Sequence, residues 1–197
     1  MSRRDKRNKF VEQKKSRTGT YFLVGILAIG VIVFGAYKLL GQSDTPAGVT
    51  NVGEVDYNSQ FIDPVQIDVI DSGGNIVIDL NKVKSDKAVT FDIPGINFTL
   101  NNGTPFDYVP IIGYVSPKGN VIMATSLCEP CSGITFHFEG DHLVCNACGT
   151  RWELEGLKGI SGGCTEYPPE TFNYTVEGDK ILIKRTDLEN WQPRVIG

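Results

Sequence analysis

Cysteines carry the clearest chemistry in this sequence. All five fall within 37 residues, and four of them form two Cys-x-x-Cys pairs separated by thirteen residues: Cys128, Cys131, Cys145 and Cys148. A short turn between two cysteines bends the backbone so that both sulfur atoms approach one point. Gly149, directly after the second pair, suits the left-handed backbone that such a turn requires. Two turns of this kind can supply four thiolates to one metal centre.

Several metals fit this cysteine pattern. Two such turns are typical of a zinc ribbon, although thirteen intervening residues is slightly fewer than the usual ~15–20. Four cysteines also bind iron–sulfur clusters, and soft thiolates favour Cu⁺ as well as Zn²⁺. Glycines around the pairs favour a cluster, because they let backbone N–H groups approach sulfur and tune its potential. These glycines are Gly133, Gly140, Gly149, Gly156, Gly159, Gly162 and Gly163.

The fifth cysteine, Cys164, ends a glycine-rich loop that can fold back over the two turns. We count it as a further candidate metal ligand, with a disulfide partner as the alternative. Disulfides are common on the oxidising side of a membrane, although five cysteines leave one without a partner. His137 and His142 lie between the pairs but off the turns, so they are less favoured as ligands.

The N-terminal residues predict a membrane anchor. Residues 1–17 hold eight basic and two acidic side chains, whereas residues 18–37 hold no charge. A bilayer core requires about 20 apolar residues of helix, and residues 18–40 meet that length. This apolar run is longer than that of a cleaved signal peptide. We therefore expect an uncleaved single-pass anchor in the cytoplasmic membrane, with the basic N-terminus cytoplasmic and the C-terminal domain extracytoplasmic.

Composition limits what the rest of the chain does. From residue 18 onward there are 11 basic and 21 acidic residues, a net charge near −10, which argues against nucleic acid as a partner. Residues 41–58 are rich in Gly, Ser, Thr, Pro and Asp and predict a flexible linker. No convergent Ser/His/Asp group and no Gly-rich phosphate loop stands out, so we expect neither bond-making catalysis nor a small-molecule substrate.

Residues 59–197 predict one mainly β domain that carries a metal-binding insert at 126–169. Short alternating runs with turn signals every eight to twelve residues are typical of a β-sandwich or partly open barrel. Pro94 and Gly95 separate two of the expected strands, and no long helical period occurs outside the membrane segment. The expected strands are 65–70, 76–80, 88–93, 96–100, 108–115, 120–125, 135–139, 142–144, 151–155, 172–176 and 180–185.

Over roughly residues 60–185 the chain resembles the membrane iron–sulfur-containing FtrD-like family. The likeness is most specific in the cysteine-rich third, where the family carries Cys-x-x-Cys, a short aromatic hairpin, Gly-Asp, Cys-x-x-Cys-Gly and Gly-Gly-Cys-x-x-x-Pro. Here these elements are Cys128 and Cys131, Phe136 and Phe138, Gly140 and Asp141, Cys145 with Cys148 and Gly149, and Gly162, Gly163, Cys164 and Pro168. Many family members have several membrane helices, so a permease-like role does not carry over to a single predicted helix.

A looser resemblance is to Rieske domains, in which two hairpin loops clamp a [2Fe–2S] cluster and a third loop covers it. The order of loops, glycine-rich segment, prolines and final strand pair is similar, but cysteine occupies both histidine positions. Four thiolates imply a lower potential, because histidine ligation raises the Rieske value.

Taken together, the resemblances imply a Rieske-like β domain that binds an iron–sulfur cluster through Cys128, Cys131, Cys145 and Cys148, and the Rieske likeness implies the [2Fe–2S] type. They imply electron transfer linked to iron uptake, with a membrane redox or iron-transport protein as partner. The alternatives are a non-redox Zn or Cu binding and delivery module, and a structural subunit whose cysteines form disulfides.

Overall fold

The structure is a computed structural model that describes residues 50–58 and 60–196, all within one compact unit of the chain. The predicted basic tail (1–17), the predicted membrane segment (18–40) and the linker up to residue 49 lie outside the described residues. Within the described ranges, no helix has the length and apolar character needed to cross a bilayer.

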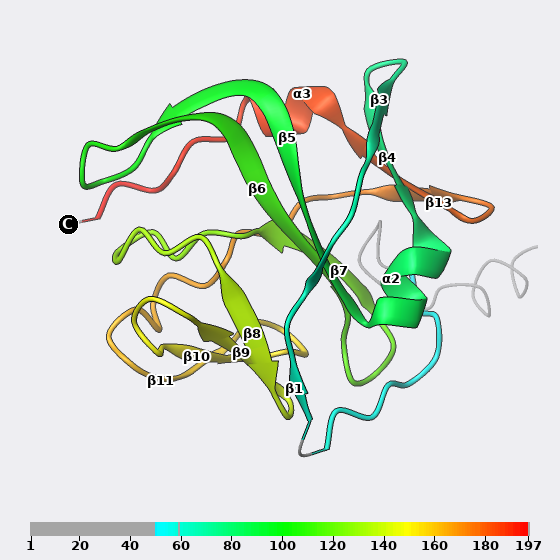
Figure 1. The fold of residues 1–197 in the computed structure, drawn as a ribbon, viewed down its shortest axis with the longest axis horizontal. Helices are drawn as coiled ribbons and strands as arrows, with labels where there is room; N and C mark the ends of the chain where they lie inside the picture. Colours follow the sequence, from blue (N-terminus) through cyan, green and yellow to red (C-terminus); the bar gives the residue numbers. More distant parts are fainter. Residues whose placement is uncertain (1–49, 59, 197) are drawn as a thin grey trace, which may run out of the picture. The chain divides into compact units, whose positions relative to one another are not determined.

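The described fold is mainly β, as predicted, and its strands form three sheets (Figure 1). In the part of the chain that the structure describes, none of these sheets closes into a barrel. The central sheet has the order β2-β5-β6-β7, made of Val65–Gln66, Ala88–Thr99, Pro105–Val115 and Val121–Thr125.

The other two sheets have the orders β12-β13-β4-β3 and β1-β8-β9-β10-β11. The four-stranded one consists of Thr175–Glu177, Lys180–Lys184, Asn75–Asp79 and Ile70–Ser72. The five-stranded one, which we call the cysteine-side sheet, consists of Phe61–Ile62, Phe136–Glu139, His142–Cys145, Arg151–Glu153 and Gly159–Ser161.

The central sheet is buried on both faces, because its side chains alternate between two hydrophobic clusters. On β6, Val109 and Ile111 enter one cluster, whereas Ile112 and Tyr114 enter the other. We call the first, which also contains residues of β4, β5 and β13, the core cluster. The second, which contains Cys128 and Cys145 among residues of β8 to β10, is the cysteine-side cluster.

Three pairs of expected strands that follow each other in the sequence form antiparallel hairpins. Strands β6 and β7 pair antiparallel from Ile111 opposite Thr125 to Val115 opposite Val121, and their turn ends at Gly119 with φ +87°. Strands β8 and β9 pair between the two cysteine pairs, and β12 pairs with β13 near the C-terminus. In each case a polar, glycine-containing turn links two short alternating runs.

Some details differ from the sequence prediction. The predicted break at Pro94 and Gly95 is wrong: both halves pair with β6, so β5 is one strand whose register shifts between Pro94 and Phe98. Two helices were missed, α2 (Leu80–Asp86) and α3 (Arg185–Glu189), because each is too short to show a helical period. The Asp79 carboxylate begins α2 by accepting a hydrogen bond from the Asn81 N–H at 2.8 Å.

Packed structure begins before residue 59, inside the predicted linker. The Tyr57 side chain is 1% exposed, and its hydroxyl donates a hydrogen bond to the Val115 carbonyl at 2.5 Å. The Val52 N–H donates to the Gly119 carbonyl at 2.8 Å. At least residues 50–58 are therefore part of the domain.

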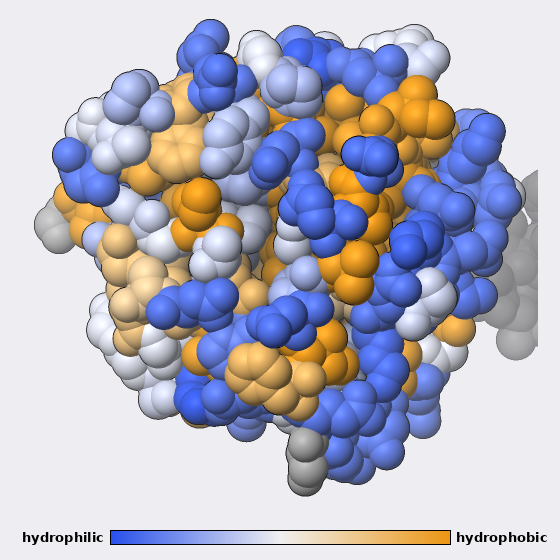
Figure 2. All heavy atoms as spheres, viewed as in Figure 1, coloured by the Kyte–Doolittle hydropathy of each residue, from blue (hydrophilic) through white to orange (hydrophobic). Residues whose placement is uncertain are grey.

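The segment from β1 to β3 crosses the face shown in Figure 2, where apolar patches alternate with hydrophilic residues. Three of the exposed large apolar side chains of the described residues lie on this segment, namely Phe61, Val65 and Ile70. The Phe61 ring stacks on the His137 ring, with centroids 4.6 Å apart, and so covers one edge of the cysteine-side sheet.

Candidate metal centre

Two loops carry the paired cysteines. The first connects β7 to β8, and the Cys128 N–H closes it by donating to the Gly133 carbonyl at 2.7 Å. The second connects β9 to β10, and the Gly149 N–H closes it by donating to the Cys145 carbonyl at 2.9 Å. Gly149 has φ +71°, the left-handed conformation expected at this position. Hairpin pairing of β8 with β9 places the two loops next to each other.

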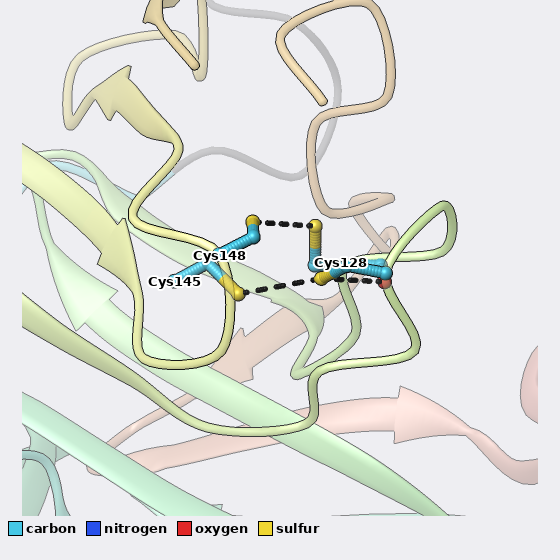
Figure 3. Close-up of side chains that lie close together, drawn as sticks. Cys128, Cys145 and Cys148 are labelled. Carbon is cyan, nitrogen blue, oxygen red and sulfur yellow. Dashed lines mark hydrogen bonds between the residues drawn. The ribbon is translucent and has the colours of Figure 1, made fainter. Parts of the chain in front are cut away.

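The four sulfur atoms converge on one point. The Sγ atoms of Cys128, Cys131, Cys145 and Cys148 all lie within 4.8 Å of one another. Two contacts join the loops: Cys128 Sγ lies 3.9 Å from Cys148 Sγ, and Cys131 Sγ lies 3.7 Å from Cys145 Sγ (Figure 3). All five cysteines are free, since these separations far exceed the ~2.05 Å of a disulfide bond.

Burial differs among the four thiols. Cys128 and Cys145 are buried, Cys131 is half-buried and Cys148 is exposed. The site therefore has an apolar inner side, formed by the cysteine-side cluster, and one edge that faces solvent at Cys148.

Hydrogen bonds to sulfur favour thiolates at part of the site. The pKa of Cys145 is lowered to about 5 by a hydrogen bond from the Cys128 thiol, with further bonds from the N–H groups of Cys148 and Ala147. Burial opposes ionisation of Cys148, but hydrogen bonds of its sulfur with the Thr150 hydroxyl, at 3.2 Å, and with the Thr150 N–H lower its pKa. Such donors stabilise the negative charge that a metal ligand requires.

The pKa values of the first pair, Cys128 and Cys131, shift in the opposite direction. A hydrogen bond with Cys145 raises the pKa of Cys128, and burial adds to this effect. Burial also raises the pKa of Cys131 to about 12, although the Gly133 N–H donates to its sulfur. Four thiols this close cannot all ionise without a compensating cation, which is the condition that a bound metal ion satisfies.

Gly133 gives direct support for a site shaped around sulfur. A Cβ atom at this position would lie 2.8 Å from Ala147 Cβ, 2.9 Å from Cys145 Sγ and 3.3 Å from Cys131 Sγ. The first loop therefore approaches the second so closely that only glycine fits. The sulfur donors and this close approach fit a thiolate-bound metal centre.

Cys164 lies beside the centre but not within the converging group. Its Sγ is 3.8 Å from Cys148 Sγ, and its N–H donates to Thr150 Oγ1 at 3.2 Å. Cys164 is not one of the four residues whose sulfur atoms are all within 4.8 Å of one another. The structure thus brings the predicted covering loop to the site, at the edge marked by Cys148.

The two histidines have other partners. His137 Nδ1 is 2.5 Å from Asn146 Oδ1, and its Nε2 is 3.2 Å from Glu139 Oε1. Neither His137 nor His142 belongs to the potential metal-binding group found in the described residues. This agrees with the weak case for histidine ligation in the sequence.

A buried ion pair, which the sequence pattern did not predict, holds the first loop. Glu129 lies between Cys128 and Cys131, and its side chain is only 2% exposed. The Arg194 N–H donates to Glu129 Oε1 at 2.7 Å, and the Arg194 guanidinium pairs with Glu129 Oε2. The guanidinium also donates to the Pro168 carbonyl at 2.6 Å. A glutamate inside a Cys-x-x-Cys turn was the available signal, but its partner is 65 residues away.

The fold and the site together define a mainly β protein with four convergent thiols that can bind a metal ion. Residues 98–195 match the family model described as "Membrane iron-sulfur containing protein FtrD-like". The chain belongs to this family through that segment, which contains all five cysteines, and the predicted family is confirmed. None of the curated proteins compared with the chain is similar to it.

Proposed function

We propose that this protein is a membrane-anchored, extracytoplasmic electron carrier that binds iron through Cys128, Cys131, Cys145 and Cys148. The observation that carries this proposal is the convergence of four sulfur atoms within 4.8 Å of one another. The family description, which names both iron–sulfur and membrane, supports iron as the metal and the membrane as the location.

Two features of the site suit electron transfer. Iron bound by thiolates supplies a one-electron couple, and N–H groups that donate to sulfur are among the protein's means of setting its potential. Those donors are present in both loops. The exposed edge at Cys148 gives a docked partner a short path to the centre, whereas the inner side is sealed by apolar residues.

The sequence pattern supports the location, and the resemblance to the FtrD-like family supports the kind of partner. The basic residues of 1–17 and the uncharged run that follows support a single-pass anchor with a cytoplasmic N-terminus. The β domain, predicted at residues 59–197 and extended by the structure to residue 50, then lies outside the cytoplasmic membrane with its metal-binding part at 126–169. The partner is a membrane redox or iron-transport protein, whose docking surface is basic because the domain is acidic.

The Rieske-like part of the proposal concerns the order of the parts. Two hairpin loops hold the cysteines, and a third loop that ends at Cys164 reaches their exposed edge, where Cys164 Sγ lies 3.8 Å from Cys148 Sγ. Because all four converging ligands are thiols, the potential should lie below that of His-ligated Rieske centres.

The test is to purify the full-length chain in detergent under anaerobic conditions, and to measure its metal content and its redox titration. We expect iron bound to the chain and one reversible reduction step. Substituting Cys145→Ser should abolish both, and a protein that holds zinc and shows no reduction would refute electron transfer.

A zinc or copper centre without redox function is the second candidate. Four soft thiolates favour it, because the Sγ–Sγ distances between the two loops are short and nearly equal, at 3.7 and 3.9 Å. Elemental analysis of the freshly isolated protein separates it from iron. Titration of free thiols, before and after reduction, tests the remaining alternative of a structural subunit with disulfides.

A further inference from the structure

We infer that the four converging cysteines hold a single metal ion in a tetrahedron of thiolates, and not a cluster of two or more irons. This inference rests on the proposed metal-binding function and specifies the number of metal ions at the same site. It departs from the [2Fe–2S] centre that the resemblance to Rieske domains implies.

The sulfur–sulfur distances carry the argument. With metal–sulfur bonds of about 2.3 Å, a tetrahedral ion separates its four sulfur ligands by about 3.8 Å along each edge. The two Sγ–Sγ contacts between the loops, 3.7 and 3.9 Å, lie on either side of that value. Every other pair among the four sulfurs also lies within 4.8 Å.

A cluster would require a wider arrangement. In a cluster, cysteines on different irons are separated by two metal–sulfur bonds and also by the distance between the irons. These thiolates point outward from the cluster, so sulfurs on different irons lie farther apart than two ligands of one ion. Four sulfurs that are all within 4.8 Å of one another fit around one ion only.

The backbone around the site resists widening. The two loops are joined at their base, where the Asn146 N–H donates to the Thr135 carbonyl at 3.0 Å. The first loop is also tied to the Pro168 carbonyl by Arg194, through the buried Glu129 carboxylate. Each N–H donor to sulfur belongs to the same loop as its acceptor, so each loop sets the position of its own sulfurs.

Cys164 has no place in such a tetrahedron. Four thiolates already complete the coordination of one ion, and Cys164 Sγ contacts the group only at Cys148. The inference therefore assigns Cys164 a position next to the centre, outside the coordination sphere.

The experiment counts metal ions and inorganic sulfide in the full-length chain, purified anaerobically in detergent. We expect one metal ion per chain, no acid-labile sulfide, and X-ray absorption that shows a single sulfur shell without metal–metal scattering. Two irons and two sulfides per chain, or a short metal–metal distance, would overturn the inference.

A second measurement covers protein that loses its metal during isolation. The metal-free chain is titrated with Co²⁺, whose intense visible bands report tetrahedral thiolate coordination. We expect an end point at one equivalent, unchanged by Cys164→Ser and abolished by Cys148→Ser. An end point at two equivalents, no tetrahedral spectrum, or loss of binding in the Cys164→Ser variant would contradict a four-cysteine, single-ion site.

These outcomes separate the two proposals. A single zinc ion with no reduction step defeats electron transfer and leaves the single-ion inference intact. A two-iron cluster with a reversible reduction step supports electron transfer and overturns the single-ion inference.

Discussion

The two hydrophobic clusters on either side of the central sheet are built differently. The core cluster is almost entirely aliphatic and aromatic, and it packs the long strands β5 and β6 against β4 and β13. The cysteine-side cluster packs the same sheet against strands of three to four residues, and it includes Cys128, Cys145 and Cys164. Its Trp152 side chain is fully buried, and the indole N–H has no hydrogen-bond partner among the described residues.

This difference indicates that the two sides depend on different interactions. Strands as short as those of the cysteine-side sheet bury little apolar area of their own, so the loops between them require further ties. The ties present are the converging sulfurs and the Glu129–Arg194 pair. Stability of the core cluster should therefore be independent of metal, whereas order in the cysteine loops should depend on it.

The largest expected effect comes from truncating one aromatic side chain in each cluster. Phe91 and Phe138 are both fully buried, the first in the core cluster and the second in the cysteine-side cluster. Replacing either with alanine should cost about 3–5 kcal/mol of unfolding free energy. We expect Phe91→Ala to leave the metal affinity of the folded protein unchanged and Phe138→Ala to lower it.

Denaturant unfolding and competition with a chelator measure these two quantities separately. If Phe91→Ala weakens metal binding as much as Phe138→Ala does, the central sheet does not isolate the two sides, and the comparison fails.

Much of the fold could be predicted because its signals are local. Alternating side chains and glycine turns identified the hairpins β6–β7, β8–β9 and β12–β13. The break expected at Pro94 and Gly95 was an error of the same local reasoning: Gly95 has φ +79°, yet the chain continues along β6 instead of reversing. Only the pairing with β6, in which Pro94 lies opposite Tyr108, distinguishes a bulge from a turn.

The site also combines features that local sequence predicts with features that it does not. The spacing of Cys128, Cys131, Cys145 and Cys148 predicted their convergence, because each Cys-x-x-Cys turn and the hairpin between them are local. The Sγ–Sγ distances that favour one ion over a cluster could not be predicted from the spacing of the cysteines. The Arg194 partner of Glu129 was not predictable either, since no sequence pattern relates residues so far apart.

A smaller effect should follow from Gly133→Ala, with Gly163→Ala as the matched control. The added Cβ at Gly133 would lie 2.8 Å from Ala147 Cβ and 2.9 Å from Cys145 Sγ, whereas nothing lies within 4 Å of a Cβ at Gly163. Forcing the two loops apart should reduce metal affinity about 10–100-fold, the size typical of residues that support metal ligands. Chelator competition measures it, and equal affinities for the two variants would show that close loop contact is not needed.

The smallest of these effects should come from Arg194→Leu, with Arg185→Leu as its control. Removing Arg194 leaves the Glu129 carboxylate buried without its charged partner, at a cost of about 1–3 kcal/mol confined to the first cysteine loop. Arg185 also pairs with carboxylates, Asp71 and Glu189, but these lie on β3 and α3, away from the cysteine loops.

We expect faster amide hydrogen exchange at residues 128–133 and faster metal release in the Arg194 variant only. Should both variants release metal at the rate of the unmodified protein, the ion pair stabilises the C-terminal segment without positioning Cys128 and Cys131. The cysteine loops would then depend on the metal and on Gly133 alone, which would sharpen the contrast with the core cluster further.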